Sequence, residues 1–250
     1  MHRPTVEVVV MNWRRPENVE AIVSTLRDQS YECTVTICDN HQSPEFALGP
    51  AAMRDAHRIF RWHHNVGPYG RYGPLALFDH TYTLFLDDDL LPGTRAVEHF
   101  VRSAEGLPNF GVLGQLGRIL VDDNYNIDEV ARDHGFTEVD IVVRAYFVKT
   151  SRLHLIPQFR WQLAPDTAEF VEDDLLLCFA MQFLGNLPCM LTPWTEDPEA
   201  RVNRIELPER YALSHRPNHI AARTNIVRRA MSLGWRPMKL RSVASAAVQT

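Results

Sequence analysis

The sequence predicts an α/β fold in which a mostly parallel β-sheet is flanked by helices. Through the first half of the chain, short apolar stretches rich in β-branched and aromatic residues alternate with segments of helical periodicity. Residues 82–86 are almost wholly apolar, as expected of a parallel strand that is buried on both faces. This strand ends in three consecutive carboxylates, Asp87, Asp88 and Asp89, at the sheet edge where such folds bind ligands.

The first half reads as four strands with helical crossovers between them, which is the connection that parallel strands require. The first strand covers residues 6–11, and an amphipathic helix follows at 16–29 with an apolar face of Val19, Ile22, Val23 and Leu26. The other expected elements are a strand at 35–38, a short helix at 51–57, a strand at 59–62, a glycine-rich segment at 65–74, a helix at 75–80 and the strand at 82–86.

The second half is less regular. No linker separates it from the first half, so residues 1–250 are expected to form one domain. The expected elements are a helix at 94–104, a bent strand or strand pair at 111–120, an acid-rich loop at 121–138, a strand at 139–148, a helix starting at 167 or 171 and ending at 184, a strand at 187–191, a helix at 225–231 and a frayed tail after 241.

Composition indicates an ordinary globular protein. The 250 residues are 45% hydrophobic, which is enough for a sizeable core. The formal net charge of -5 argues against a nucleic-acid partner, although it leaves room for local basic sites. No apolar run has the length of a membrane span and no secretory signal is recognisable, so a cytoplasmic protein is expected. The four cysteines form no CxxC pair, which favours buried free thiols over a zinc site.

The acid triplet is the strongest chemical signal. Three adjacent carboxylates repel one another at the end of a strand unless a cation neutralises them, and their hard oxygen atoms suit Mg²⁺ or Mn²⁺. Such an ion would in turn hold an anion, most simply a diphosphate. The alternative is a solvated turn closed by Pro92 and Gly93, but the buried strand before the acids favours a ligand site.

Two further segments carry groups suited to the same site. After the first strand, Asn12, Trp13 and Arg14 supply polar and planar groups for a base and ribose, unless they only form a turn before Pro16. A second acidic cluster, Glu172 to Asp174, precedes a helix. Its carboxylates could cap the helix dipole, or one could act as a general base opposite the metal.

The segment from His215 to His219 is a third candidate. A histidine there could complete the coordination of the metal, and Arg216 could meet phosphate oxygens in a forked geometry. The alternative is a surface loop with solvated histidines. Two histidines four residues apart also suggest a zinc helix, but Pro217 between them disfavours a helix.

In order along the chain, these segments resemble GT-A glycosyltransferases. The opening Val6-Glu-Val-Val-Val-Met-Asn-Trp-Arg-Arg-Pro-Glu-Asn-Val19 is similar to their first strand and helix, and Val35-Thr-Ile-Cys-Asp39-Asn40 to their second strand. Asn65-Val-Gly67 with Gly70-Arg71 is similar to their Asn-x-Gly segment. Phe85-Leu-Asp87-Asp88-Asp89 matches their Asp-x-Asp motif, and Glu172-Asp173-Asp174 their late acidic motif. The ordered co-occurrence is more specific than any single match.

The resemblance implies a GT-A fold with a nucleotide-binding half at 1–92, an acceptor-binding half at 93–241 and a flexible tail at 242–250. It implies that a nucleotide-sugar donor contacts residues from several of these motifs, listed as Met11, Asn12, Trp13, Arg14, Asp39, Asn65, Arg71, Asp87, Asp88 and Arg216. The implied metal ligands are Asp89, Asp87, His219 and His215, and the catalytic carboxylate is Asp173 or Asp174.

The function implied is metal-dependent transfer of a sugar from a nucleotide-diphosphate donor, UDP being the commonest nucleotide among relatives, to a hydroxyl acceptor. The acceptor could be a carbohydrate, a lipid-linked molecule or a small molecule. Trp161, Trp194, Glu172 and the acid-rich loop at 122–138 are candidates to contact it, although for the tryptophans a place in the core is favoured. The late acidic motif is closer to the exostosin-like, retaining branch than to the inverting family 2, and the opening segment fits both. Rival functions are a sugar-1-phosphate nucleotidyltransferase and a non-catalytic nucleotide- or carbohydrate-binding relative.

Overall fold

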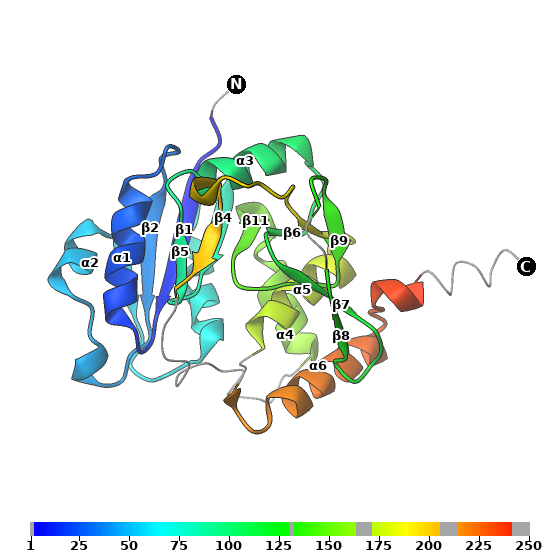
Figure 1. Ribbon diagram of the computed structural model, residues 1–250. Helices are drawn as coiled ribbons and strands as arrows, with labels where there is room; N and C mark the ends of the chain where they lie inside the picture. The colour runs from blue at the N-terminus through cyan, green and yellow to red at the C-terminus, as the bar shows by residue number, and fades with distance from the viewer. Residues whose placement is uncertain (1–2, 131–132, 164–171, 206–214, 242–250) are drawn as a thin grey trace, which may run out of the picture.

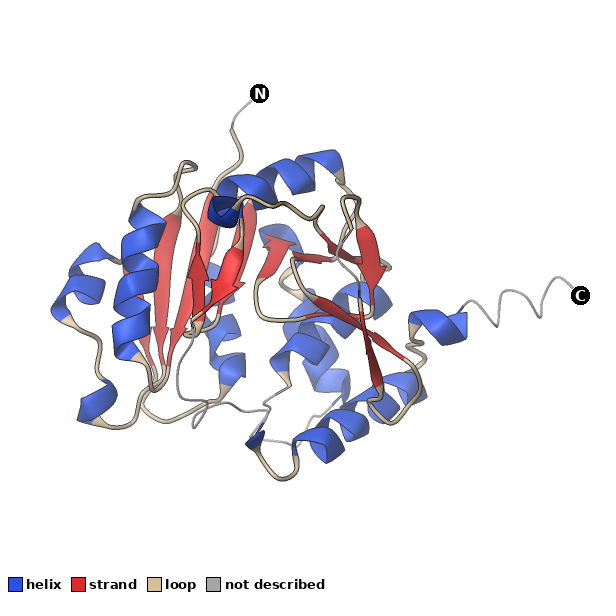
Figure 2. Cartoon of the chain, viewed as in Figure 1, coloured by secondary structure: helices blue, strands red, loops and turns tan. Residues whose placement is uncertain are grey.

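An eight-stranded sheet runs through the described part of the molecule, and helices cover both of its faces (Figures 1 and 2). The computed structural model describes residues 3–130, 133–163, 172–205 and 215–241. The strand order in the sheet is β3-β2-β1-β4-β11-β6-β12-β9. Its strands are β1 (Val6–Asn12), β2 (Thr34–Asp39), β3 (Arg58–Arg61), β4 (Tyr82–Leu86), β6 (Val112–Gly114), β9 (Thr137–Val139), β11 (Tyr146–Lys149) and β12 (Cys189–Leu191). The predicted α/β class is confirmed.

The four strands of the first half are parallel. β1 pairs with β2 on one side and with β4 on the other, and β3 pairs with β2. In this register, Met11 lies opposite Cys38 and Val10 opposite Leu86. The carboxyl ends of the strands therefore meet at one edge of the sheet, and the segments that follow them are brought together there.

Alternation along β1 divides the interior into two cores. Val6, Val8 and Val10 pack with one set of helices, and Val9 and Met11 with another. The first core lies under α1 (Pro16–Arg27), α2 (Pro50–Asp55) and α3 (Ala96–Gly106), and the second under α4 (Leu155–Leu163), α5 (Asp173–Phe183) and α6 (His219–Leu233). The predicted apolar face of α1 is buried in the first core.

The second half supplies the antiparallel part. β11 pairs antiparallel with β4 and β6, and β9 with β12. Two small antiparallel sheets are added, with the orders β10-β7-β8 and β13-β5. Their strands are β5 (Leu90–Pro92), β7 (Gly117–Leu120), β8 (Ile127–Glu129), β10 (Ile141–Val142) and β13 (Val202–Arg204). β5 directly follows the acid triplet and pairs with β13, so β13 lies close to the triplet.

Several predicted elements need correction. The helix expected at 75–80 is instead the 3₁₀ segment η2 (Pro68–Leu77), which starts at a proline as helical turns often do. The expected loop at 121–138 contains β8 and the start of β9. The strand expected at 139–148 is divided between β9, β10 and β11, and the break between β10 and β11 contains Arg144, which takes the left-handed conformation with φ of +75°.

The remaining short elements are the 3₁₀ segments η1 (Pro44–Phe46), η3 (Thr150–Arg152) and η4 (Pro198–Ala200). The expected tail at 242–250 and the start of the helix expected from 167 or 171 lie outside the described residues. No helix that the structure describes combines the length and apolar character needed to cross a membrane.

Candidate active site

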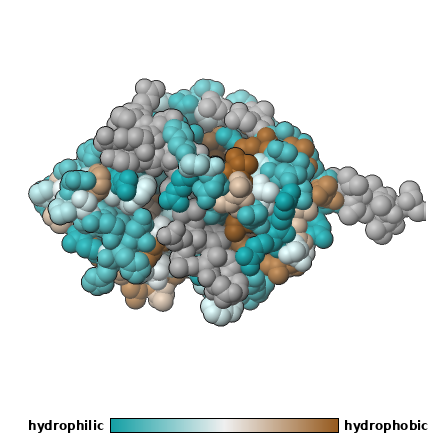
Figure 3. Space-filling model, turned by 90° about the horizontal axis from the view of Figure 1, so that it is seen from below, coloured by the Kyte–Doolittle hydropathy of each residue, from teal (hydrophilic) through white to brown (hydrophobic). Residues whose placement is uncertain are grey.

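A cavity of about 320 Å³ opens at the carboxyl ends of β1, β2 and β4. Figure 3 views the molecule from this side, where hydrophilic side chains predominate on the left, over the elements of the first half. The walls of the cavity combine acidic, basic and amide side chains with a few apolar ones. The lining residues are Met11, Trp13, Arg15, Asn40, Asn65, Gly67, Pro68, Arg71, Asp87, Asp88, Asp89, Arg144, Asp173, Arg204 and Arg216.

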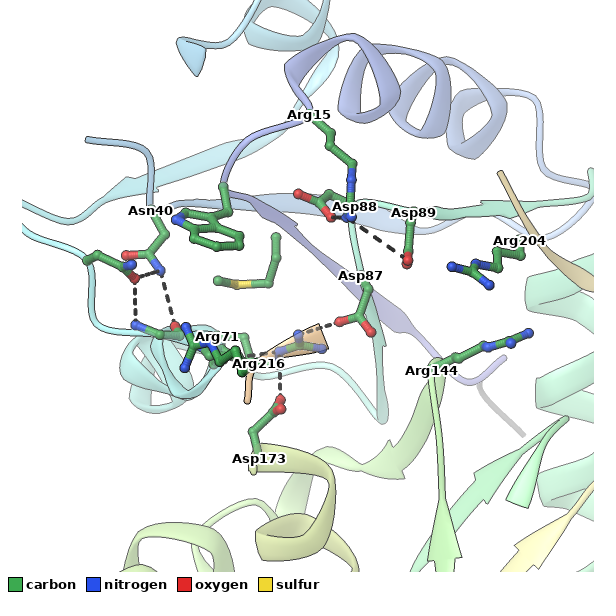
Figure 4. A pocket seen from close by; sticks show the side chains of 15 residues that line it. Arg15, Asn40, Arg71, Asp87, Asp88, Asp89, Arg144, Asp173, Arg204 and Arg216 are labelled. Atoms are coloured by element: carbon green, nitrogen blue, oxygen red, sulfur yellow. Dashed lines mark hydrogen bonds and ion pairs between the residues drawn. The ribbon is translucent and has the colours of Figure 1, made fainter. Parts of the chain in front are cut away.

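The three acids of the triplet have different environments (Figure 4). Asp88 is buried, and its carboxylate accepts a hydrogen bond from Arg15 Nη1 at 2.5 Å. The backbone carbonyl of Asp88 also accepts one from Asn18 Nδ2 of α1, at 2.8 Å. The side chains of Asp87 and Asp89 remain 32% and 28% exposed and line the cavity. The middle acid therefore anchors the loop to α1, and the outer two are available to a ligand.

Arg71 joins the two acidic clusters. This side chain is only 3% exposed, its Nη2 donates to Asp87, and its Nε lies 3.1 Å from Asp173 Oδ2. Its guanidinium carbon also stands 5.7 Å from the ring centre of Tyr146. The clusters at Asp87 and Asp173 thus form one wall of the cavity, and Arg71 is a buried link between them.

The two candidate catalytic acids differ in how they are held. Asp174 Oδ2 pairs with Arg223 Nη2 at 2.5 Å, and Asp174 Oδ1 accepts a hydrogen bond from the backbone of Leu175 at 2.9 Å. Asp173 lines the main cavity. Burial raises the pKa of Asp173 to about 7, with Arg71 opposing the rise and the charges of Asp87 and Asp174 adding to it. Asp173 is therefore a carboxyl group that exchanges protons near neutral pH.

A second cavity of about 170 Å³ continues from this wall. It shares Asp87, Asp173 and Arg216 with the first. Its other polar lining residues are Tyr146, Glu172, Asp174, Asn218, His219 and Arg223. Burial lowers the pKa of His219, and the neighbouring charge of Arg223 lowers it further, which favours the neutral imidazole. Glu172 and His219 are thus brought to the site, whereas the exposed His215 lines none of the described cavities.

The opposite end of the main cavity is built from Trp13, Met11 and an asparagine pair. Asn40 Nδ2 donates to Asn65 Oδ1 at 2.9 Å, and Asn40 Oδ1 accepts from the backbone of Val66 at 3.0 Å. Gly67 has a left-handed φ of +68°, which suits a glycine in this turn. These bonds fix the glycine-rich loop against the end of β2, where the loop and Trp13 form one wall of the cavity.

Three predicted donor contacts lie behind this wall. Asp39 is fully buried and pairs with Asn12 Nδ2 at 2.8 Å, His41 Nδ1 at 2.6 Å and Arg61 Nε at 2.8 Å. Arg14 is exposed and stacks on Trp13, with its guanidinium carbon 4.4 Å from the ring centre. None of Asn12, Arg14 and Asp39 lines the cavity, so they shape it from outside.

Trp161 is also away from the site. It lies on α4, is 70% exposed and lines none of the described cavities. The core alternative for this tryptophan is wrong, because it is on the outer face of the helix, while Ile156, Phe159 and Leu163 occupy the inner one.

The predicted list omits four polar side chains that line the cavity, namely Arg15, Asn40, Arg144 and Arg204. The first two stand inside quoted motifs, directly beside Arg14 and Asp39, so the signal was present in the sequence. Arg144 and Arg204 have no such signal. Arg204 comes to the site only because β13 pairs with β5, where Arg204 lies opposite Leu90.

The donor set can be compared with the needs of a divalent cation. Within the described residues, no three His, Cys, Asp or Glu side chains are close enough together to form a metal site of their own. Asp87 and Asp89 are nevertheless two residues apart, both are partly exposed, and both line the cavity. Mg²⁺ is commonly held by one or two carboxylates plus substrate phosphates and water. The residues therefore fit a cation that binds together with a diphosphate.

Arg71→Gln tests the buried link. It would leave the buried Asp173 and the partly exposed Asp87 without their shared counter-charge, and breaking a buried ion pair costs about 3–5 kcal/mol. We expect a loss of that order in the free energy of unfolding, measured by urea denaturation. The control is Arg102→Gln, because Arg102 is 76% exposed and pairs with Glu98 on the surface of α3, where ~0.5 kcal/mol is typical. Equal losses for the two variants would contradict the role given to Arg71.

Comparisons with known proteins bear on the fold. No family model matches the sequence, and no curated protein matches it either. The chain is similar to the crystal structure of S. aureus TarS, with a TM-score of 0.55 and 15% identity over 82% of this chain and 37% of that one. The structure of TarS 1-349 in complex with UDP gives 0.56 and 15%, over 82% and 61% of the two chains. TarS 1-349 alone gives 0.53 and 13%, over 76% and 58%.

This chain therefore spans about two fifths of the length of the full TarS chain it matches. At such low identity the likeness concerns the fold alone, and the TarS fold is of the GT-A type. The described sheet, with parallel strands in the first half and an antiparallel addition in the second, has the same architecture. The chain has the GT-A fold that the sequence predicts.

Proposed function

We propose that this protein is a glycosyltransferase that moves a sugar from a nucleotide-diphosphate donor, a UDP-sugar, to a hydroxyl acceptor. The observation that carries the proposal is the single cavity wall on which Asp87, Arg71 and Asp173 are joined. On this wall the carboxylate of Asp87 is linked through Arg71 to the buried Asp173, whose pKa is raised to about 7. Such groups suit the transfer of a sugar from a nucleotide diphosphate.

The donor fits the cavity in one direction. Its base lies against Trp13 and Met11 near Asn40, and its diphosphate reaches Asp87 and Asp89 at the other end, with Arg216 beside it. The planar ring of Trp13 suits a nucleobase. The fold neighbour solved in complex with UDP supports uracil as this base.

Asp87 and Asp89 would hold Mn²⁺ or Mg²⁺ against the diphosphate oxygens. When bound, this ion supplies Lewis-acid stabilisation of the charge that develops on the leaving phosphate. His219, on the wall of the adjoining cavity, is the histidine placed to approach the diphosphate, since His215 is not. Asp88 contributes by fixing the loop through Arg15 rather than by binding the ligand.

Asp173 is assigned as the general base. The acceptor oxygen forms a bond to the anomeric carbon, the bond from that carbon to the phosphate oxygen breaks, and the hydroxyl proton passes to Asp173. The diphosphate leaves with the bonding electron pair. A pKa near 7 suits proton transfer at neutral pH. Asp174 is held by Arg223 and supports the wall.

Thermal shift with UDP tests donor binding. Ligand present at 100 times its Kd stabilises the folded state by about 2.7 kcal/mol. We expect UDP to raise Tm by several degrees in the presence of Mn²⁺ and much less in EDTA, since the carboxylate pair alone repels the diphosphate. ADP and GDP serve as matched nucleotide controls. A shift that does not depend on the cation would contradict the metal-linked diphosphate site.

Turnover separates this function from its rivals. A nucleotidyltransferase needs a glycine-rich phosphate loop after the first strand, whereas the turn after β1 holds Trp13, Arg14 and Arg15, the last of which is bound to Asp88. Release of UDP from UDP-sugars supports the proposal. Formation of UDP-sugar from UTP and a sugar 1-phosphate would overturn it, as would donor binding without turnover of any donor in a panel of nucleotide sugars.

A further inference from the structure

A third cavity lies beside the donor site and is lined by arginines. It has a volume of about 170 Å³ and shares Arg144 and Arg204 with the main cavity, so the two adjoin. Arg201 and Trp194 complete its polar and aromatic wall. No carboxylate stands among the described residues that line it. Figure 4 shows Arg144 and Arg204 beyond Asp87 and Asp89, on the side away from Asn40.

Arg144 is held in an uncommon backbone conformation. Its φ of +75° is left-handed, which is unfavourable for a residue with a long side chain. It stands between β10 and β11, two strands that are held in different sheets. Such outliers concentrate at binding sites, where the surrounding structure holds them in place. The conformation directs the residue to the boundary between the two cavities, which it lines on both sides.

The arginines are close enough to affect one another. Burial lowers the pKa of Arg144, and the neighbouring charge of Arg204 lowers it further, with Asp89 acting in the opposite direction. No carboxylate of the described residues comes within ion-pair distance of Arg144. By contrast, Arg15, Arg71 and Arg223 of the donor site each pair with an aspartate at 3.1 Å or less. A cluster of like charges facing a cavity is an anion site.

The wall of the third cavity is held in place by contacts with the rest of the protein. Arg201 stacks on Trp194, with its guanidinium carbon 5.1 Å from the ring centre, and within the described residues its buried Nε has no hydrogen-bond partner. Gln115 ties this segment down, because its amide donates to the carbonyl of Ala200 at 2.9 Å and accepts from the backbone of Val202 at 2.8 Å. Ile205 is bonded through its backbone to the carbonyl of Asp89, at 2.8 Å. The arginines thus have a fixed position relative to the metal loop.

From this cavity we infer that the acceptor carries a phosphate ester, which Arg144, Arg201 and Arg204 bind while the acceptor hydroxyl reaches the donor sugar. The inference rests on the proposed function. Planar guanidinium groups match phosphate oxygens in pairs, and three of them exceed what a single carboxylate would neutralise. Trp194 offers a flat face for the sugar or polyol that bears the phosphate.

The position of the third cavity suits the binding of an acceptor and not of the donor. The donor diphosphate has Asp87, Asp89 and Arg216 in the main cavity, whereas Arg201 and Trp194 line only the third one. Arg144 and Arg204 stand at the junction, where a phosphate bound to the acceptor would lie near the leaving diphosphate. Arg201 is therefore the residue whose replacement separates acceptor binding from donor binding.

The test compares three probes by titration calorimetry in saturating UDP and Mn²⁺: methyl glucoside, its 6-phosphate monoester, and the corresponding methyl phosphodiester. UDP occupies the donor site, so the phosphates cannot bind there. We expect at least one phosphorylated probe to bind ten or more times more tightly than methyl glucoside. Arg201→Gln should weaken that probe at least fivefold and change the Kd of UDP less than twofold. The monoester and diester arms tell which phosphate the site takes.

Controls keep the result interpretable. Arg201→Lys retains the charge, so it should keep part of the affinity for the phosphorylated probe even if Arg201→Gln is poorly folded. Arg102→Gln removes an exposed arginine from α3 and should change nothing. Phosphorylated probes that bind no better than methyl glucoside would overturn the inference, as would tighter binding that Arg201→Gln leaves intact. If UDP itself neither binds nor is released from UDP-sugars, the proposed function has failed. If UDP binds but the protein shows no preference for phosphorylated probes, only the inference of a phosphate-bearing acceptor has failed.

Discussion

Asp173→Asn is expected to lower kcat by about 10²–10⁴-fold, the usual contribution of a general base. The amide preserves the shape of the side chain and cannot take the acceptor proton. Because the donor contacts belong to other residues, the Kd of UDP should stay within about threefold of the wild-type value, which calorimetry measures. The matched variant is Asp174→Asn. This acid is held by Arg223, so its loss should lower stability more than turnover. A larger fall in kcat for Asp174→Asn would reassign the base.

The same residue predicts a pH profile. A base acts when it is deprotonated, and burial raises the pKa of Asp173 to about 7. In the wild type, kcat/KM should therefore rise about tenfold per pH unit below pH 7 and level off above it, since this parameter reports ionisations of the free enzyme. The residual activity of Asp173→Asn should lack that limb. A profile that is flat from pH 5 to 8 in the wild type would contradict the assignment.

Asp89→Asn is expected to abolish detectable turnover and to weaken UDP binding in Mn²⁺. The substitution removes one of the two carboxylates that the cavity offers to a cation, and with it a charge that balances the ion against the diphosphate. EDTA should reduce the wild type to the same level, and added Mn²⁺ should restore the wild type only. Steady-state rates and calorimetry with and without Mn²⁺ measure both effects.

A surface acid at the other end of β4 provides the control. Asp79 lies before β4 with its side chain 89% exposed, so Asp79→Asn removes the same charge outside the cavity. It should leave turnover and the response to EDTA unchanged. Wild-type rates in EDTA, or a variant at Asp89 that still responds to Mn²⁺ as the wild type does, would exclude the cation site proposed here.

Much of the first half could be predicted because its strands are continuous apolar runs and its helix has a regular apolar face. β1, β2 and β4 need no tertiary information to be recognised, and parallel pairing then brings their ends together. The second half lacks such signals. α4 was missed because Pro157 interrupts its pattern, although proline is tolerated in the first turn of a helix. β5 and β13 have three residues each and exist because they pair with one another.

The site divides in the same way. The two acidic clusters and the asparagine loop were visible as motifs, and the fold brings them to one cavity. Which acid of each cluster meets a ligand could not be predicted, because that depends on partners from distant segments, Arg15 for Asp88 and Arg223 for Asp174. The arginine wall was missed altogether. Its members come from 144, 201 and 204, and no local spacing relates them to the acids.

The left-handed backbone at Arg144 has a consequence for the evolution and engineering of this protein. Such a conformation costs about 1–2 kcal/mol for an ordinary residue and almost nothing for glycine. Selection for thermal tolerance alone would therefore favour glycine at position 144. That change would remove the positive charge of Arg144 from the two cavities that it lines. Stability therefore favours glycine at position 144, whereas the proposed function favours arginine.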